Sequence, residues 1–206
     1  MKIYDISMEI HPEMPLYKDQ EQYRPTITVH HDFNSGKYHQ SSIEINMHSG
    51  THIDAPLHML AEGGAVDNLD LNKLVAKCKV YSLTHLPDRI TEKDLRDRDI
   101  TNGDFVILKT RNSLIDKFDP EFVYLDKSAA AYLKSKEVIG VGIDALSIER
   151  NQPDHDTHTL LLGAGIIILE GLRLKRIEDG EYLMVAVPLN IKGVEASPVR
   201  AVLVRF

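Results

Sequence analysis

Residues His48 to His58 read His-Ser-Gly-Thr-His-Ile-Asp-Ala-Pro-Leu-His, and the interpretation of the whole chain starts from this stretch. Three histidines and one aspartate fall within these eleven residues. Imidazole nitrogens and carboxylate oxygens are the usual ligands of zinc and its first-row neighbours, and such ligands often come from one short segment. The stretch therefore predicts a metal site, with the rest of the chain as its scaffold.

The conformation of the stretch is decided by Pro56. The pairs His48/His52 and Asp54/His58 are each four residues apart and would lie on one face of a helix. In a helix, however, the ring of Pro56 would collide with the carbonyl of His52. We therefore expect an extended or looped path in which His52 and Asp54 project to one side and the residue between them to the other.

Alternating polar and apolar residues predict strands before this stretch. Residues 2–7 form the first, and a proline-containing loop follows. Residues 26–30 and 38–47 alternate again on either side of a turn at 34–36, which predicts an antiparallel hairpin with a wide loop. His48 then leaves the second arm of the hairpin on its polar side.

Helical and strand patterns alternate after the stretch. The pattern predicts helices at 70–76, from Thr91 onward, at 128–136 and at 155–162, and strands at 79–83, 105–108, 138–143, 166–169, 182–187 and 199–204. The strand at 166–169 is of special interest, because Glu170 follows directly at its end. This order predicts an α/β fold with a mixed, partly antiparallel sheet flanked by helices.

Length and composition limit the classes of protein to consider. With 206 residues, 43% of them hydrophobic and 27% charged, the chain fits one domain spanning residues 1–206. A net charge of -7 argues against a nucleic-acid or anionic-membrane surface, which needs clustered Lys and Arg. We therefore expect a small molecule as the partner.

The sequence also predicts a cytoplasmic location. Residues 1–7 lack the apolar block of a signal peptide, and no apolar run reaches the roughly 18 residues that span a bilayer. Cys78 is the single cysteine, so no disulfide can form within the chain, which suits a reducing compartment. Its lysine neighbours suggest no catalytic or ligand role, and we expect it to fill the core.

Several well-known site motifs are missing. There is no HExxH helix, paired CxxC or twelve-residue calcium loop, and no GxSxG elbow or glycine-rich phosphate loop. The simpler alternative is that the four polar residues of the stretch cap turns and bind backbone groups. That explanation has to account for four such residues at once on a segment stiffened by proline.

The spacing His48-x-Gly-Thr-His52-x-Asp54-x-Pro-x-His58 resembles the HxGTHxDxPxH signature of the cyclase-like metal-dependent hydrolases. This family includes bacterial kynurenine formamidase (arylformamidase) and isatin hydrolase. The resemblance continues through residues 5–7, 142–147, 158–170 and 197–201, and so covers nearly the whole chain. It implies a barrel-like core of the swivelling β/β/α type, flanked by helices.

The resemblance also implies the ligand set. Residues His48, His52 and Asp54 would hold one divalent ion, and Asp54 would bridge to a second ion held by His158 and Glu170. The most suitable metal is zinc, with manganese as the alternative, because the set contains no thiolate. Independently, Glu170 ends an apolar run, and a carboxylate in that position needs a partner that offsets its desolvation. The family further implies a homodimer or homotetramer.

The expected chemistry is hydrolysis of an amide. A metal can lower the pKa of a bound water from about 15.7 to near 7, which provides hydroxide at neutral pH, and a second ion can polarise the substrate carbonyl. His58 lies in the motif but outside the ligand set. We expect it to be the catalytic proton shuttle, because an imidazole titrates near neutrality.

The resemblance implies N-formylkynurenine as the substrate, with kynurenine and formate as products in tryptophan catabolism. Kynurenine formamidases, however, carry a tryptophan near the start and a Trp-Pro-Gly-Asp-like loop, whereas this chain has no Trp and reads Pro15-Leu16-Tyr17-Lys18-Asp19. The alternatives are a relative that hydrolyses another cyclic amide or ester, such as isatin, and a noncatalytic metal-binding or ligand-binding protein with the same fold.

The remaining polar residues receive simpler interpretations. His30, His31, His39 and His85 are expected at the surface, and the run Arg173 to Arg176 as a solvated face. Asp144 and Ser147 follow a predicted strand and suit a site or a turn cap equally well. His155 lies one helical turn before His158, which leaves open a supporting role behind a ligand.

Overall fold

The structure, a computed structural model, describes all residues from 1 to 206. Its strands are β1 (Lys2–Asp5), β2 (Thr26–His31), β3 (Gln40–Glu44), β4 (His52–Asp54), β5 (Val75–Ser82), β6 (Arg89–Ile90), β7 (Phe105–Lys109), β8 (Tyr124–Leu125), β9 (Gly140–Ile143), β10 (Ile167–Glu170), β11 (Gly180–Val185), β12 (Ala196–Pro198) and β13 (Val202–Arg205). Its α-helices are α1 (Glu92–Leu95), α2 (Lys127–Ser135) and α3 (Asp156–Gly163).

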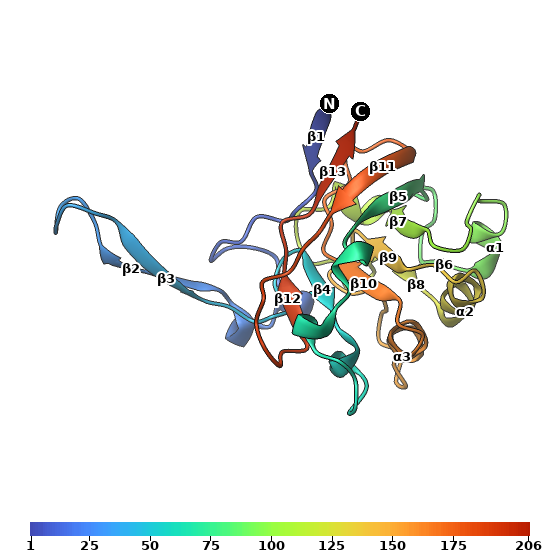
Figure 1. Ribbon diagram of the computed structural model, residues 1–206, viewed down its shortest axis with the longest axis horizontal. Coiled ribbons are helices and arrows are strands. Elements are labelled where there is room, and N and C mark those ends of the chain that lie inside the picture. Colours follow the sequence, from blue (N-terminus) through green and yellow to red (C-terminus); the bar gives the residue numbers. More distant parts are fainter.

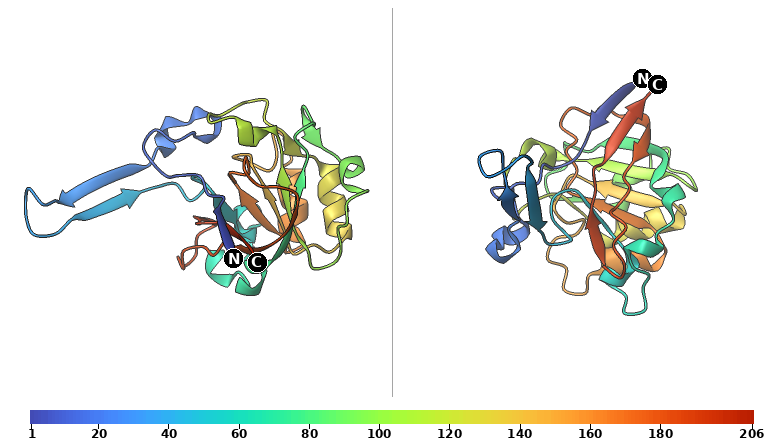
Figure 2. Two further views of the ribbon diagram at one scale, coloured as in Figure 1. Left: turned by 90° about the horizontal axis from the view of Figure 1, so that it is seen from above. Right: turned by 60° about the vertical axis from the view of Figure 1, so that its left-hand side comes forward.

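Nine strands form one curled, mixed sheet in the order β1-β13-β11-β5-β7-β9-β10-β4-β12. The central strands β5, β7, β9 and β10 run parallel to one another, and the strands at both ends pair antiparallel. All three helices lie along one face of the sheet (Figures 1 and 2). The predicted α/β class with a mixed sheet is confirmed.

Apolar side chains bury both faces of the central strands. On β7, Val106 and Leu108 belong to the cluster beneath the helices, whereas Phe105 and Ile107 belong to the cluster on the opposite face. A strand covered on both sides has to be apolar at every position, which explains the continuous run in the sequence. Ile53 of β4 lies in the second cluster and anchors the predicted metal-binding stretch to the core.

The predicted hairpin is confirmed and forms an arm. Strands β2 and β3 pair antiparallel outside the main sheet, and Figures 1 and 2 show that they project far from the body of the protein. Every residue of both strands is exposed, including Ile27, Val29 and Ile43. The second strand ends at Glu44, earlier than the expected Met47.

One predicted element is wrong: residues 70–76 do not form an α-helix. Asp70 instead accepts a hydrogen bond from the backbone N–H of Asn72 and begins a single 3₁₀ turn, Leu71–Lys73. From Val75 onward the chain pairs with β11, and this ladder runs from Val75 to Val80. Pairing with a neighbouring strand therefore outweighs the weak helical pattern.

The other helices and strands after residue 90 appear where they were predicted, within a few residues. Three short strands were not predicted: β6 and β8, which pair with each other, and β12 at the edge of the main sheet. Pro198 in β12 is tolerated there because an edge strand needs hydrogen-bond donors on one side only. None of the helices has the length and apolar character that crossing a membrane requires.

Gly171 follows β10 and lets this strand lie directly against the loop before β4. Its φ is +69°, and a Cβ atom at this position would lie 2.2 Å from the carbonyl oxygen of Gly50. The Thr51 hydroxyl donates a hydrogen bond to the carbonyl of Gly171 over 2.7 Å. Any side chain at residue 171 would push the two segments apart.

We therefore expect Gly171→Ala to lower the free energy of unfolding by about 2 to 4 kcal/mol, since it combines a steric clash with a strained backbone. Urea unfolding followed by circular dichroism measures the change. Gly163→Ala, at the end of α3 with open space around the new methyl group, is the matched control and should stay within about 1 kcal/mol of the wild type. Equal losses in the two variants would contradict this account of Gly171.

Candidate metal centre

Strand β4 carries two of the predicted ligands, His52 and Asp54, to a third, Glu170 of β10. It lies between β10 and β12 and pairs antiparallel with both. Its register with β10 sets His52 directly opposite Glu170. Because side chains alternate along a strand, His52 and Asp54 share one face while Ile53 is buried on the other, as predicted.

The loop before β4 fixes which nitrogen of His52 is available. The Nδ1 atom of His52 lies 3.1 Å from the carbonyl oxygen of Gly50, which can only accept a hydrogen bond. Nδ1 therefore keeps its proton, and Nε2 is the nitrogen that would present a lone pair to a bound cation. Thr51 holds this loop in place, since its Oγ1 accepts a hydrogen bond from the N–H of Met8 over 2.7 Å.

Five of the predicted site residues form one tight group around Asp54. His48 Nδ1 lies 3.0 Å from Asp54 Oδ1, and His52 Nε2 lies 3.5 Å from the same oxygen. His158 Nε2 lies 3.6 Å from Asp54 Oδ2. Glu170 closes the group, with Oε2 at 3.2 Å from His52 Nε2 and Oε1 at 3.3 Å from His158 Nε2.

The group has the unsatisfied polar atoms that a bound cation would satisfy. Both carboxylate oxygens of Asp54 are buried and accept no hydrogen bond, and His52 Nε2 is also without a partner. A buried carboxylate that accepts no hydrogen bond costs several kcal/mol unless nearby positive charge offsets its loss of water. Nitrogen and oxygen donors of this kind suit a first-row divalent ion, so the residues present fit a metal.

The electrostatics of the group also favour a positive charge at its centre. Burial alone would raise the pKa of the Asp54 carboxyl, but contacts with His158 and His48 hold it well below its usual value. Burial would likewise lower the pKa of His52, yet Glu170 and Asp54 raise it to about 9. The carboxylates therefore keep their charge and retain protons on the neighbouring imidazoles until a cation replaces them.

His58 lies beside this group and is held by a short turn, Pro56–His58. Its ring centroid is 4.3 Å from that of His48 and 5.5 Å from that of His158. Burial, together with the histidines nearby, lowers the pKa of His58 below its ordinary value. The ring is therefore neutral at neutral pH, with one nitrogen free to accept a proton.

A cavity of about 340 Å³ opens onto these residues. His48, His58, His158 and Glu170 line one part of its wall, and three apolar or aromatic side chains, Tyr17, Met59 and Leu146, line another. Lys18, which has left-handed backbone geometry with a φ of 54°, also lines it. The cavity can therefore hold an organic molecule with one end at the candidate metal ligands.

The distances divide the ligands differently from the division expected from the resemblance. His48, Asp54 and His58 form one group whose ligand atoms all lie within 4.8 Å of one another, and His52, Asp54 and Glu170 form another. Asp54 is common to both, which suits a bridging carboxylate. His58 is thus close enough to act as a ligand as well as a base.

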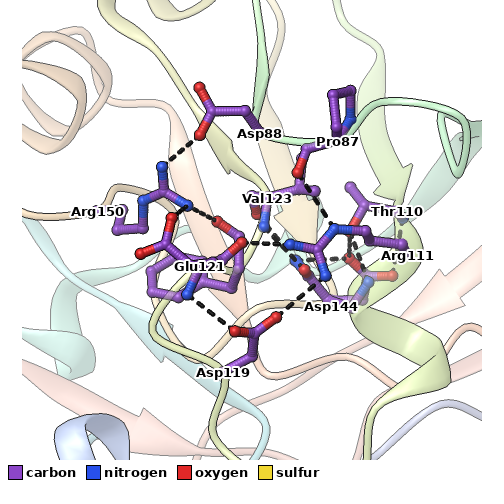
Figure 3. Close-up of polar contacts among 11 residues, drawn as sticks. Pro87, Asp88, Thr110, Arg111, Asp119, Glu121, Val123, Asp144 and Arg150 are labelled. Carbon is purple, nitrogen blue, oxygen red and sulfur yellow. Dashed lines mark hydrogen bonds and ion pairs between the residues drawn. The ribbon is translucent and has the colours of Figure 1, made fainter.

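Asp144 is a structural residue away from this group. Its carboxylate is buried and accepts hydrogen bonds from the hydroxyl groups of Thr110 (2.7 Å) and Ser113 (2.6 Å) and from their backbone N–H groups. Figure 3 shows Asp144 beside the ion pair of Arg111 and Asp119. Of the two interpretations of Asp144, capping of a turn is the one that matches these contacts.

The simpler interpretations of the other residues largely match the structure. His30, His31, His39 and His85 are all exposed. Cys78 is buried in the core, which raises the pKa of its thiol to about 12. The run Arg173 to Arg176 matches the expected solvated face only at Lys175 and Arg176, because Arg173 is partly buried and Leu174 is fully buried in the core.

Two acidic residues near the centre were not predicted. Glu149 is buried, and its Oε1 lies 3.3 Å from His158 Nδ1. Glu195, just before β12, lies 3.6 Å from His48 Nε2. Neither residue belongs to a periodic sequence pattern. Glu149 reaches the site through its contact with α3, and Glu195 through the pairing of β12 with β4. His155, left open above, contacts Glu149.

The sequence and the structure were compared with known proteins. A family model described as "Putative cyclase" matches residues 4–150. Among curated proteins, the kynurenine formamidase of Salinibacter ruber is 30% identical over 206 residues, which covers 98% of this chain and 97% of that protein.

Two solved structures show the same fold. A predicted metal-dependent hydrolase from Bacillus stearothermophilus is 48% identical, with a TM-score of 0.90 over 98% of this chain and 97% of that one. Isatin hydrolase A from Labrenzia aggregata is 21% identical, with a TM-score of 0.86 over 98% and 93% of the two chains, and shares the fold. Since the family model matches most of the sequence and a curated relative matches nearly all of it, the chain belongs to the cyclase family.

Proposed function

We propose that this protein is a metal-dependent amide hydrolase that converts N-formylkynurenine to kynurenine and formate, and so acts in tryptophan catabolism. The observation that carries the proposal is the buried carboxylate of Asp54, which has no hydrogen-bond partner and is ringed by His48, His52 and His158. The similarity to curated kynurenine formamidases over nearly the whole chain supports the reaction class.

The proposed cofactor is a pair of divalent ions, zinc or alternatively manganese. His48, His52 and Asp54 would hold one ion, and Asp54, His158 and Glu170 would hold the other. A set of imidazoles and carboxylates without thiolates suits both metals. Bound there, the metal would supply activation of a water molecule and polarisation of the substrate carbonyl.

His58 is the proposed proton carrier. Its neutral imidazole can accept a proton from the attacking water and then donate it to the nitrogen that leaves when the amide bond breaks. The lowered pKa supports this role, because a neutral ring is needed for the first transfer. The position of His58 on the wall of the cavity also supports this role.

The substrate is proposed to lie with its aromatic ring between the apolar residues of the cavity, namely Tyr17, Met59 and Leu146. The chain has no tryptophan, and its loop Pro15-Leu16-Tyr17-Lys18-Asp19 differs from the Trp-Pro-Gly-Asp-like loop of kynurenine formamidases. This difference favours a second candidate, hydrolysis of another cyclic amide or ester, such as isatin. A noncatalytic metal-binding role is the remaining alternative.

We further propose that the protein works in the cytoplasm as a homodimer or homotetramer. The arm of β2 and β3 supports assembly, because a two-stranded hairpin exposed on both faces is marginally stable by itself. A second copy of the chain would cover Ile27, Val29 and Ile43. Sedimentation of the purified protein at the mass of one chain would contradict assembly.

Removal of the metal tests the proposed reaction. After dialysis against a strong chelator, hydrolysis of N-formylkynurenine should fall to background, and addition of zinc or manganese should restore it. Isatin and formanilide assayed in parallel distinguish the two candidate substrates. Full activity in protein shown by elemental analysis to be free of metal would overturn the mechanism.

Replacement of His58 tests the proton-carrier role. We expect His58→Ala to lower kcat about 100-fold or more while the content of bound metal stays unchanged. His39→Ala, at an exposed position of the arm, is the control and should keep full activity. If His58→Ala loses metal together with activity, His58 is a ligand in the group with His48 and Asp54.

A further inference from the structure

Glu149 stands behind His158 and is almost completely shielded from solvent, with 2% of its surface exposed. One carboxylate oxygen, Oε2, accepts hydrogen bonds from the backbone N–H groups of Thr157 (3.0 Å) and His158 (3.3 Å). The other oxygen, Oε1, lies 2.5 Å from His155 Nδ1 and 3.3 Å from His158 Nδ1. A buried carboxylate with this many partners is held in one orientation.

The backbone around Glu149 is also fixed. Its neighbour Arg150 donates a hydrogen bond to the carbonyl oxygen of Phe122 over 3.0 Å and pairs with Asp88 (Figure 3). On the other side, the N–H of Ile148 donates a hydrogen bond to Glu170 Oε1 over 2.6 Å. Residues 148–150 are therefore tied to the candidate ligand Glu170 on one side and to Phe122 and Asp88 on the other.

The contact with Glu149 determines how His158 presents its ring. His158 Nδ1 is buried and makes no hydrogen bond of regular geometry, but Glu149 Oε1 lies 3.3 Å from it. The negative charge of the carboxylate, which can only accept a hydrogen bond, favours the proton on Nδ1. Nε2 is then the nitrogen that would give up its proton to a bound cation, and it faces Asp54 Oδ2 at 3.6 Å and Glu170 Oε1 at 3.3 Å. In metal sites, a carboxylate behind a histidine fixes the ring in this way and raises its basicity.

Glu149 also replaces the usual cap of helix α3. The N-cap residue, His155, has a left-handed φ of 46° and makes no side-chain hydrogen bond to the first turn. The free N–H groups at the start of the helix are taken by Glu149 from a different segment of the chain. The start of α3, and with it His158, is thus docked onto Glu149.

We infer that Glu149 is a positioning residue that holds His158 with Nε2 directed at Asp54 and Glu170 and thereby sets the affinity of the metal centre. This inference rests on the proposed function, in which His158 is a ligand. The structure offers one competing role, because Glu149, His155 and His158 could together hold an ion of their own. That role would leave Glu149 only Oε1 as a ligand, because backbone N–H groups occupy Oε2, and it would need bare Nδ1 atoms on both His155 and His158.

The test compares metal affinity in two variants that each alter the cap of a helix. Glu149→Gln keeps the size of the side chain but removes the charge that faces His158. Asp126→Asn is the matched control, since Asp126 caps α2 with hydrogen bonds to the N–H groups of Ser128 and Ala129 and lies outside the candidate centre. The dissociation constant for zinc is measured by competition with a chromophoric chelator, and Tm is measured on the metal-free proteins.

We expect Glu149→Gln to bind zinc about 10- to 100-fold more weakly than the wild type, and Asp126→Asn to bind it as the wild type does. Imidazole ¹⁵N chemical shifts of the zinc-loaded wild type should show the His158 proton on Nδ1. Wild-type affinity in Glu149→Gln, or an equal loss in Asp126→Asn, would overturn the inference, as would a proton on Nε2.

A third variant distinguishes the positioning role of Glu149 from the competing role as a ligand of a separate ion. His155→Ala should keep the wild-type number of zinc ions per chain; loss of one ion would assign Glu149, His155 and His158 to a separate site and overturn the inference. The failure of the proposed function looks different, because the wild-type protein itself would then bind no zinc or manganese tightly. The two failures are therefore distinguishable in the same titration.

Discussion

The candidate metal centre depends on one buried group, the carboxylate of Asp54. Strand β4 holds it between β10 and β12, so that its backbone is paired on both sides while its side chain points at three histidines. Its two oxygens have no hydrogen-bond partner. A folded protein tolerates such a group only where a cation or a ring of imidazoles offsets the loss of water.

The rest of the architecture can be understood as the support of that carboxylate. Thr51 and Gly171 hold the loop before β4 against the end of β10, which keeps His52 opposite Glu170. Helix α3, on the face of the sheet to which Asp54 points, supplies His158, and Glu149 fixes its first turn. The candidate ligands thus come from three separate segments, and each segment is tied to the core or to another candidate ligand.

The sequence predicted this centre to the extent that its residues sit in local patterns. The proline in the stretch from His48 to His58 excluded a helix, and the apolar run before Glu170 indicated a strand that ends in a carboxylate. Both expectations about local conformation match the structure. The division of the ligands between two ions was suggested by the family resemblance alone, and the distances place His58 nearer to the ligand set than expected.

What could not be predicted depends on contacts between distant segments. Glu149 has no helical or strand periodicity around it, and its role exists only because α3 folds back onto it. The helix expected at residues 70–76 was wrong because pairing with β11 captures the chain from Val75 onward. Strand β12 was missed because three residues ending in a proline give no recognisable alternation, although the open edge of β4 accepts them.

The number of metal ions per chain in the wild type and in Asp54→Asn tests the central claim most directly. The amide of asparagine keeps the size of the side chain but cannot bridge two cations as a carboxylate does. Elemental analysis of the purified proteins, each equilibrated with zinc, should give two ions per chain for the wild type and a loss of both in the variant. Retention of two ions by Asp54→Asn would contradict the account of Asp54 as the shared ligand.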